Sequence, residues 1–386
     1  MPFQCDFNAT TPLDSEVVAL MHALMVQGVA NPSSPHRAGQ QAKQLLEEAR
    51  QDLASALGAS PSGVIFTSGA TEAAFIAVMG FALAAPASRD RMVISAVEHK
   101  AVFAAAETAA KLTGKQLVVA PVNSDGVIDV PVLESLLDGN VALLAVMTAN
   151  NETGALQPLD DIVDLASQHA IDVFADASQS IGKEPFDFRR LGVSAAAISA
   201  HKFNGPRGIG ALLLSPDAKK RVTSVMPGGG QESALRGGTE NVIAAIGMAT
   251  AAQNAMRNLG PRRSNMVLAR DAFEGKLREV LPNRIVNSQS VTRLDNTSNF
   301  RIPSYAAEEL LLLCPDLEAS PGSACQSASP MPSHVLTAMG LTPLEAEESL
   351  RISFGHNSGA DEAESIAELI GSAAQQIDVI REGERG

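Results

Sequence analysis

The sequence predicts an α/β protein in which a large domain with a mostly parallel sheet precedes a smaller α+β domain. The first observation is a repeated order of short apolar run, turn and amphipathic helical stretch, which places helices on both faces of a parallel sheet. The second is a change of texture after about residue 255, where a long charged helix and shorter strands follow. The third is the composition, because 45% hydrophobic and 19% charged residues are typical of a folded protein.

Apolar runs of strand length alternate with segments of helical period through the first two thirds of the chain. We predict strands at Val64–Thr67, Met92–Ser95, Leu117–Ala120, Val141–Thr148, Ile171–Ala175, Ala195–Ser199 and Gly210–Ser215. We predict helices at Ser15–Val26, Ala42–Leu57, Glu72–Ala84, Lys100–Thr113 and Asp160–His169. In the C-terminal region we predict helices at Arg263–Val280 and Ala306–Leu313 and strands at Arg284–Asn287 and Asn299–Ile302.

The three cysteines differ in their sequence surroundings. Cys5, Cys314 and Cys325 form no paired framework and no CxxC spacing, which argues against a disulfide scaffold and against a zinc site, so we expect no metal. Cys325 alone lies in Ala319–Pro330, which holds four Ser, two Pro and one Gly in twelve residues. This composition is typical of a mobile surface loop, and it separates Cys325 from the other two cysteines.

Charge and segment length exclude several classes of function. The formal charge is −14, from 43 acidic and 29 basic residues, and such a surface repels the phosphate backbone of nucleic acids. The N-terminal segment lacks the basic and apolar regions of a signal peptide. The longest uncharged apolar windows, Ala73–Ser88 and Asn241–Met256, are shorter than the roughly 18 residues that predict a membrane span. We therefore expect a cytoplasmic protein that binds neither membranes nor nucleic acids.

The segment Thr67–Glu72 leads from an apolar strand directly into a helix. Free backbone N–H groups at the helix N-terminus, with Gly69 allowing close approach and hydroxyl groups beside them, form an anion site suited to a phosphate. The alternative is that Ser68 or Thr71 only caps the helix. The residues alone leave both interpretations open.

Asp176 and Lys202 each follow an apolar strand. Asp176 stands at the C-terminal end of its strand, where α/β sheets place ligands. A buried carboxylate needs a cationic partner, either a protonated pyridine nitrogen or a structural Arg or Lys. Lys202 precedes a turn punctuated by glycine, and a lysine at a buried strand end can have the lowered pKa that an aldehyde-binding amine needs. Taken alone, each signal is weak.

A phosphate cradle, a strand-end aspartate and a lysine in this chain order resemble the pyridoxal-phosphate enzymes of aminotransferase fold type I. The finer resemblance is to cysteine desulfurases of the NifS/IscS-like group, in the class V aminotransferase family, and it covers nearly the whole chain in ten motifs. These motifs span Asn8–Asp14, Asn31–Gly39, Phe66–Ala73, Glu98–Val102, Ala149–Pro158, Asp176–Lys183, Ser199–Gly210, Gly228–Asn241, Ser320–Leu336 and Ser349–Gly355.

The resemblance implies the domain organisation. A large domain with a seven-stranded, mostly parallel sheet would span residues 13–260. A smaller C-terminal α+β domain would span 261–386, joined by residues 1–12.

The resemblance also implies the catalytic roles. Lys202 would hold the aldehyde of pyridoxal 5'-phosphate and then carry the substrate Cα proton, while Asp176 would pair with the pyridinium nitrogen. His99 would stack on the pyridine face and act as an acid–base group. Cys325, as a thiolate, would attack the sulfur of L-cysteine and keep it as a persulfide while L-alanine leaves.

The remaining implied contacts hold the cofactor and the substrate. Asn151 and Gln179 would hydrogen-bond the cofactor near its phenolic oxygen, and Arg351 would clamp the substrate carboxylate, a bidentate task suited to a guanidinium. Thr239 would reach the phosphate of the neighbouring subunit in a homodimer. The phosphate would also contact Ala70, Thr71, Ser199 and His201, and the substrate pocket would include Asn8, Ala9 and Asn151.

These roles predict a cysteine desulfurase that passes sulfur to a protein acceptor. The acceptor would be an iron–sulfur scaffold, a tRNA-modifying enzyme or another sulfur carrier. The rivals on the same cofactor are a selenocysteine lyase, another C–S lyase and a class V transaminase, although a transaminase needs no cysteine on a mobile loop. A non-catalytic dimeric scaffold is the rival from a different class, and the presence of Lys202, Asp176 and Arg351 argues against it.

Overall fold

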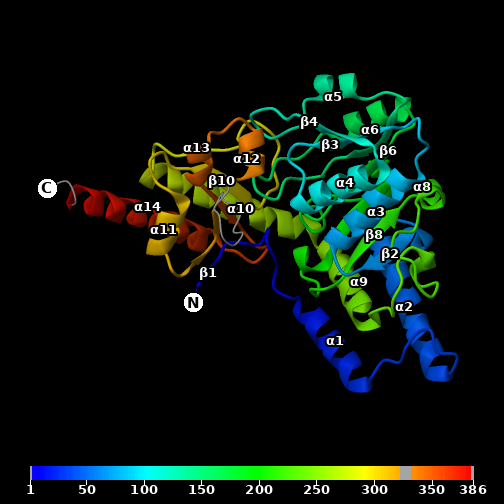
Figure 1. Cartoon of the computed structure of the whole chain (residues 1–386). Helices are drawn as coiled ribbons and strands as arrows, with labels where there is room; N and C mark the ends of the chain where they lie inside the picture. Colours follow the sequence, from blue (N-terminus) through cyan, green and yellow to red (C-terminus); the bar gives the residue numbers. More distant parts are fainter. Residues whose placement is uncertain (1, 322–331, 384–386) are drawn as a thin grey trace.

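A computed structural model describes residues 2–321 and 332–383 of the chain. A large sheet with its helices forms the greater part of the molecule, and a smaller C-terminal region lies at one side of it (Figure 1). The large sheet has the strand order β2-β8-β7-β6-β5-β3-β4. Its strands are β2 (Val64–Thr67), β3 (Arg91–Ser95), β4 (Gln116–Ala120), β5 (Val141–Ala145), β6 (Asp172–Asp176), β7 (Ala195–Ser199) and β8 (Gly210–Leu214).

The predicted α/β fold with a seven-stranded, mostly parallel sheet is confirmed. Strands β4, β3, β5, β6 and β7 run parallel, and β8 pairs antiparallel with both β7 and β2. Each of the seven predicted apolar runs forms one strand, because a strand buried on both faces reads as a continuous apolar run. The run predicted at Val141–Thr148 is longer than β5, which ends at Ala145, since the last residues bend into the loop beside the central cavity.

Helices cover both faces of the sheet, and alternate strand residues enter two different cores. Phe66 and Leu144 pack with α1, α2, α6 and α9, whereas their neighbours Ile65 and Leu143 pack with α3 and α4 on the opposite face. This alternation is the period of two that strands impose. The helices of this part are α1 (Ser15–Gln27), α2 (Arg37–Ala56), α3 (Ala70–Ala84), α4 (Lys100–Thr113), α5 (Val130–Leu136), α6 (Leu159–Gln168), α7 (Phe188–Leu191), α8 (Pro216–Arg221) and α9 (Val242–Arg257).

Helix α2 begins earlier than the apolar period predicts. The prediction placed its start at Ala42, but the helix starts at Arg37 because the ring of His36 accepts a hydrogen bond from the N–H of Gly39 at 3.2 Å. A polar first turn closed by a side-chain cap has no apolar period, so it was missed.

The C-terminal region contains a four-stranded antiparallel sheet in the order β12-β13-β10-β9. The N-terminal strand β1 (Phe3–Gln4) pairs with β11 of this region, so the first residues of the chain join the last part of it. The strands are β9 (Ile285–Val286), β10 (Thr297–Arg301), β11 (Leu317–Glu318), β12 (Ser320–Pro321) and β13 (Ser349–Ser353). The helices are α10 (Leu259–Val280), α11 (Ala307–Leu313), α12 (His334–Ala338), α13 (Pro343–Glu347) and α14 (Ala360–Gly383).

The boundary of the two domains at residues 260 and 261 stays a prediction. It falls at the beginning of α10, which packs against α14 and contributes Phe273 and Leu277 to the C-terminal core. In the described ranges, every helix is too short or too polar to cross a lipid bilayer.

Candidate active site

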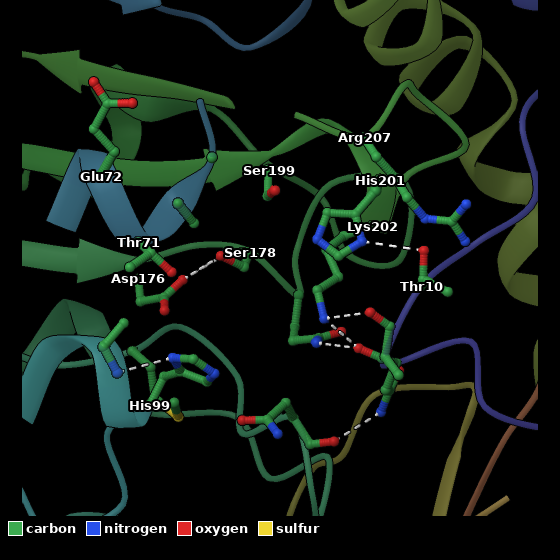
Figure 2. A pocket seen from close by; sticks show the side chains of 18 of the residues that line it. Thr10, Thr71, Glu72, His99, Asp176, Ser178, Ser199, His201, Lys202 and Arg207 are labelled. Atoms are coloured by element: carbon green, nitrogen blue, oxygen red, sulfur yellow. Dashed lines mark hydrogen bonds between the residues drawn. The ribbon is translucent and has the colours of Figure 1, made fainter. Parts of the chain in front are cut away.

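A cavity of about 750 Å³ opens where the central parallel strands end (Figure 2). This is the carboxyl edge of the sheet, where α/β proteins bind their ligands. The cavity is bordered by the N-terminal segment, by the first turns of α3 and α4, and by the loops after β5, β6 and β7. Of the predicted site residues, it is lined by Asn8, Ala9, Ala70, Thr71, His99, Asn151, Asp176, Gln179, Ser199, His201, Lys202 and Arg351.

The N-terminus of α3 forms one wall of the cavity. Its N-cap residue is Gly69, no side chain caps it, and the N–H groups of Ala70 and Thr71 have no partner within the described residues. Gly210 of β8 makes the tight approach feasible, because a Cβ there would lie 2.7 Å from Cα of Gly69. The oxygen of Ser199 lies beside the same turn. Free N–H groups of this kind favour an anion over simple capping.

His201 adds a neutral ring to the cavity wall. Its Nδ1 lies 3.1 Å from Oγ1 of Thr10 (Figure 2). Burial lowers the pKa of His201 to about 4, with the positive charges of Lys202 and Arg207 acting in the same direction. The ring is therefore uncharged at neutral pH, and hydrogen bonding is its means of holding a ligand.

Asp176, the last residue of β6, carries a carboxylate that has no ion-pair partner within the described residues. One oxygen, Oδ1, accepts hydrogen bonds from the N–H of Ser178 at 2.9 Å and from its hydroxyl at 2.5 Å (Figure 2). Only 9% of Asp176 is exposed, and no lysine or arginine of the described chain forms an ion pair with it. A buried carboxylate in this state is suited to a cationic ligand group.

His99 caps α4 and points from its first turn into the cavity (Figure 2). Its Nδ1 accepts a hydrogen bond from the N–H of Ala101 at 3.1 Å, so the proton of the neutral ring belongs to Nε2. Burial lowers the pKa of His99, while the charge of Asp176 opposes this shift and that of Lys202 adds to it. The ring therefore presents a neutral N–H donor to the cavity.

Lys202 follows β7 and is held by the N-terminal segment. Its Nζ donates hydrogen bonds to the carbonyl oxygens of Asn8 at 2.6 Å and of Ala9 at 3.0 Å. Burial lowers the pKa of Lys202 from 10.5 to about 8, and the nearby charge of Arg351 acts in the same direction. Roughly a tenth of the amines are then neutral and nucleophilic at pH 7.

A second lysine, which the sequence interpretation gave no role, fixes the segment that holds Lys202. Lys183 is buried, and its Nζ donates to Oδ1 of Asn8 at 2.8 Å and to Oε1 of Gln179 at 2.5 Å. Gln179 in turn donates to the carbonyl oxygen of Asn8 at 2.9 Å, and Asn8 donates to that of Asn151 at 3.2 Å. The two bonds of Gln179 fix the orientation of its side-chain amide. The signal was present in the sequence, since Lys183 ends the motif that begins at Asp176.

Arg351 lies in the middle of β13 with only 7% of its surface exposed. Its Nη1 donates to the carbonyl oxygen of Asn151 at 2.9 Å, and its Nη2 donates to the carboxylate of Asp6 and to Oγ of Ser320, the latter at 2.7 Å. The sequence interpretation missed Asp6 as a partner, because 345 positions separate it from Arg351. It also missed the cavity residues Thr10, Ser178 and Arg207.

Of the predicted site residues, two are not placed in this cavity by the described part of the chain. Thr239 is exposed and does not line it, and its predicted contact is with a second subunit, so that role stays a prediction. Cys325 lies outside the described residues. Cys5 and Cys314 are buried, and burial raises the pKa of both thiols, which makes them poor nucleophiles.

Comparison with known proteins identifies the family. The model of the family "Aminotransferase class-V" matches residues 4–366. A cysteine desulfurase of Frankia sp. (strain EuIK1) is 39% identical over 391 residues, which cover 96% of this chain and 91% of that protein. The chain belongs to the class-V aminotransferase family, in its cysteine desulfurase branch.

Solved structures agree with this assignment. A NifS-like protein superposes with a TM-score of 0.90 at 30% identity, covering 97% of this chain and 100% of the other. A structure described as SspA in complex with cysteine has a TM-score of 0.79 at 29% identity, covering 92% and 99%. The resemblance inferred from the ten sequence motifs is therefore confirmed.

Class-V aminotransferases and cysteine desulfurases use pyridoxal 5'-phosphate, and the cavity fits this cofactor. The free N–H groups of α3 suit its phosphate, the carboxylate of Asp176 suits its ring nitrogen, and the amine of Lys202 suits its aldehyde. Among residues 2–321 and 332–383, no cluster of three or more His, Cys, Asp or Glu side chains is arranged to hold a metal ion.

Proposed function

We propose that this chain is a cysteine desulfurase that converts L-cysteine to L-alanine and transfers the sulfur to Cys325. One observation carries the proposal. Lys202, with a pKa lowered to about 8, shares one cavity with the unpaired carboxylate of Asp176 and with the guanidinium of Arg351. A reaction at the Cα of an α-amino acid on this cofactor needs three groups. They are an amine that binds the aldehyde, a partner for the ring nitrogen and a cation that holds the substrate carboxylate.

When bound, pyridoxal 5'-phosphate supplies an electron sink for the charge that develops at the substrate Cα. Asp176 keeps the ring nitrogen protonated, and the bonds from Ser178 keep the carboxylate in place. The N–H groups of α3, together with Ser199 and His201, hold the phosphate. Gln179, oriented by Lys183, and Asn151 hold the phenolic edge.

Lys202 has two tasks in this proposal. Its neutral amine would hold the cofactor aldehyde, and as a free amine Nζ would take the Cα proton of the substrate. The carbonyl oxygens of Asn8 and Ala9 keep Nζ beside the cavity between these steps. His99 would border the cofactor ring and act as an acid–base group, accepting a proton on its ring before it donates one.

Arg351 binds the substrate carboxylate and so directs the side chain of cysteine. The thiolate of Cys325 then attacks the substrate sulfur, a new S–S bond forms, and the C–S bond breaks with its electron pair moving to the substrate carbon. Protonation of that carbon gives alanine. The two other cysteines are excluded as nucleophiles by burial and by their raised pKa values.

We further propose a cytoplasmic homodimer that shares its active sites through Thr239. A protein sulfur acceptor takes the persulfide, for use in iron–sulfur clusters or other thio-cofactors. The cysteine desulfurase relatives and the NifS-like structure support this assignment of pathway.

The test measures alanine and sulfide released from L-cysteine in the presence of a reductant. The wild type is expected to release both in equal amounts, and Cys325→Ala neither. Cys314→Ala is the matched control and is expected to retain the wild-type rate. Activity that survives in Cys325→Ala would assign sulfur removal to a lyase reaction, and no alanine from any variant would refute the proposed function.

A further inference from the structure

Arg351 already holds a carboxylate in this structure, that of Asp6. Its Nη2 donates to Oδ1 of Asp6 and to Oγ of Ser320, and Oγ of Ser320 lies 2.9 Å from the same Oδ1. A substrate carboxylate that binds a guanidinium bidentately needs two of its N–H groups. Asp6 therefore occupies part of the site that the proposed function assigns to the substrate.

The contact made by Asp6 is a weaker one than a bidentate clamp. Only Oδ1 reaches the guanidinium, and the side chain of Asp6 is 31% exposed, against 9% for that of Arg351. A carboxylate at the edge of a site retains part of its hydration, so it can leave without the desolvation cost that a buried charge incurs. An incoming carboxylate with two contact atoms is therefore able to replace it.

A second cation, Arg207, lines a pocket whose wall also includes Asp6. A pocket of about 400 Å³ adjoins the active-site cavity, and its walls include Asp6, Thr10, Arg207 and Glu318. Arg207 lines both spaces, on the side of Thr10 and His201 (Figure 2). Within the described residues, its side chain makes no ion pair and no hydrogen bond.

We propose that Asp6 is an internal competitor for the carboxylate site of Arg351, and that Arg207 receives it when a carboxylate ligand binds. This inference rests on the proposed function, which makes Arg351 the carboxylate clamp. It makes Asp6 a specificity-determining residue. A ligand with only a carboxylate has to displace Asp6 and binds weakly, whereas the amine and sulfur of cysteine add contacts that a simple carboxylate lacks.

The experiment measures binding of butyrate to the cofactor-loaded protein by titration calorimetry. Butyrate has the carboxylate and the length of cysteine but no amine to displace Lys202 and no thiol. Asp6→Asn keeps the shape and the hydrogen-bonding oxygen but removes the charge, so the Kd for butyrate is expected to fall about tenfold, or about 1.4 kcal/mol. Arg207→Gln is expected to raise the Kd about threefold, because Asp6 then has no second partner.

The matched control is Glu318→Gln. It removes a negative charge from the same pocket, at a residue that makes no ion pair with Arg351 in the described chain. The Kd of this variant for butyrate is expected to stay at the wild-type value. The double variant Asp6→Asn/Arg207→Gln distinguishes a movement of Asp6 to Arg207 from a general electrostatic effect of the two charges on the ligand. If Asp6 moves to Arg207, the Arg207→Gln effect disappears in the Asp6→Asn background. Thermal unfolding of each variant verifies that it is folded.

Three results would overturn the proposal. They are an unchanged or raised Kd in Asp6→Asn, an equal gain in Glu318→Gln, and an Arg207→Gln effect of the same size in both backgrounds. Alanine release plays no part in this readout, so a failure of the proposed function and a failure of the Asp6 exchange are seen in different assays.

Discussion

The amine of Lys202 lies 2.6 Å from the carbonyl oxygen of Asn8, a residue 194 positions earlier in the chain. The N-terminal segment is therefore part of the active site. It reaches the cavity because β1 pairs with β11 and because Lys183 holds the side chain of Asn8. The hydrogen-bond acceptor of Lys202 is a backbone oxygen, which no side-chain substitution removes directly. The role of this contact is therefore tested by substituting the lysine itself.

Lys202→Ala is expected to abolish both cofactor retention and alanine formation. Among the described residues that line the cavity there is no other lysine to bind the aldehyde covalently, so the purified variant is expected to lack the visible absorbance of the bound cofactor. Alanine release from L-cysteine is expected to fall by a factor of at least about 10³. The control is Lys220→Ala, which removes an exposed lysine paired with Asp217, and it is expected to be yellow and active. A yellow Lys202→Ala protein would contradict the assignment.

The pKa of Lys202 predicts how the rate of cofactor capture depends on pH. Only the neutral amine attacks an aldehyde, so the capture rate of cofactor-stripped protein is expected to rise with pH, with a midpoint near pH 8. The profile of an ordinary lysine would have its midpoint near pH 10.5. Stopped-flow absorbance with added pyridoxal 5'-phosphate measures this profile, and a midpoint near 10.5 would refute the lowered pKa.

The same shift predicts an effect on stability. Below about pH 8 the amine is protonated in both the folded and the unfolded state, and the folded state carries the full cost of burying the charge. Between about 8 and 10.5 the folded protein loses its proton first, so this cost disappears as pH rises. Lys202→Met is therefore expected to unfold at a higher temperature than stripped wild type below pH 8, with no difference above 10.5. An equal gain at all pH values would indicate packing as the cause.

Asp176→Asn is expected to keep the fold but to lose most of the activity. The amide oxygen still accepts the hydrogen bonds from Ser178, but the negative charge that keeps the cofactor ring protonated is gone. Removing one electrostatic contact of this kind lowers kcat by about 10²–10³. Ser178→Ala is a milder variant for comparison, because it leaves the charge of Asp176 and removes one hydrogen bond from a hydroxyl group. Its kcat is expected to fall by about tenfold or less. Steady-state alanine release measures both, and equal losses in the two variants would refute a special role for the charge.

Much of the fold was predictable because local patterns determine it. The strand Val64–Thr67 and the helix Lys100–Thr113 have the predicted bounds, since an apolar run or an amphipathic period is bounded by turn residues at each end. The start of α2 was not predictable from periodicity, because the side chain of His36 determines it.

The candidate site divides in the same way. Asp176 and Lys202 were singled out because each comes at the end of an apolar run, but each signal is weak alone, and their predicted roles came from the resemblance that the ten motifs carry. The pairing of Asp6 with Arg351 and the burial of Lys183 arise from contacts between distant segments. Such contacts produce no periodic pattern in the sequence. From sequence alone, a charged residue that forms an ion pair in the folded protein cannot be distinguished from a solvent-exposed charge.

Glu98 is an acidic residue whose protonation depends on its place in the fold. It is completely buried, its Oε1 accepts a hydrogen bond from the N–H of Met147 at 2.5 Å, and its Oε2 has no partner within the described residues. Burial raises the pKa of Glu98 well above its usual value, and the nearby charge of Asp176 acts in the same direction. The neutral form of this carboxyl group is therefore favoured over a wider pH range in the folded protein than in the unfolded chain.

The sign of this shift determines how stability responds to pH. Below about 4.5 the group is protonated in both states and its charge costs nothing. As pH rises from there towards the raised pKa of the folded state, Glu98 ionises in the unfolded chain but not in the folded protein. Ionisation lowers the free energy of the unfolded chain, so the wild-type protein loses stability. Glu98→Gln has the same shape and no charge, and it is expected to match wild type below about 4.5 and to exceed it increasingly at higher pH. Denaturant unfolding across this pH range measures the difference, with the exposed Glu134→Gln as a control that should show none. A Glu98→Gln protein that is less stable than wild type at neutral pH would mean that Glu98 is ionised and paired in the folded state.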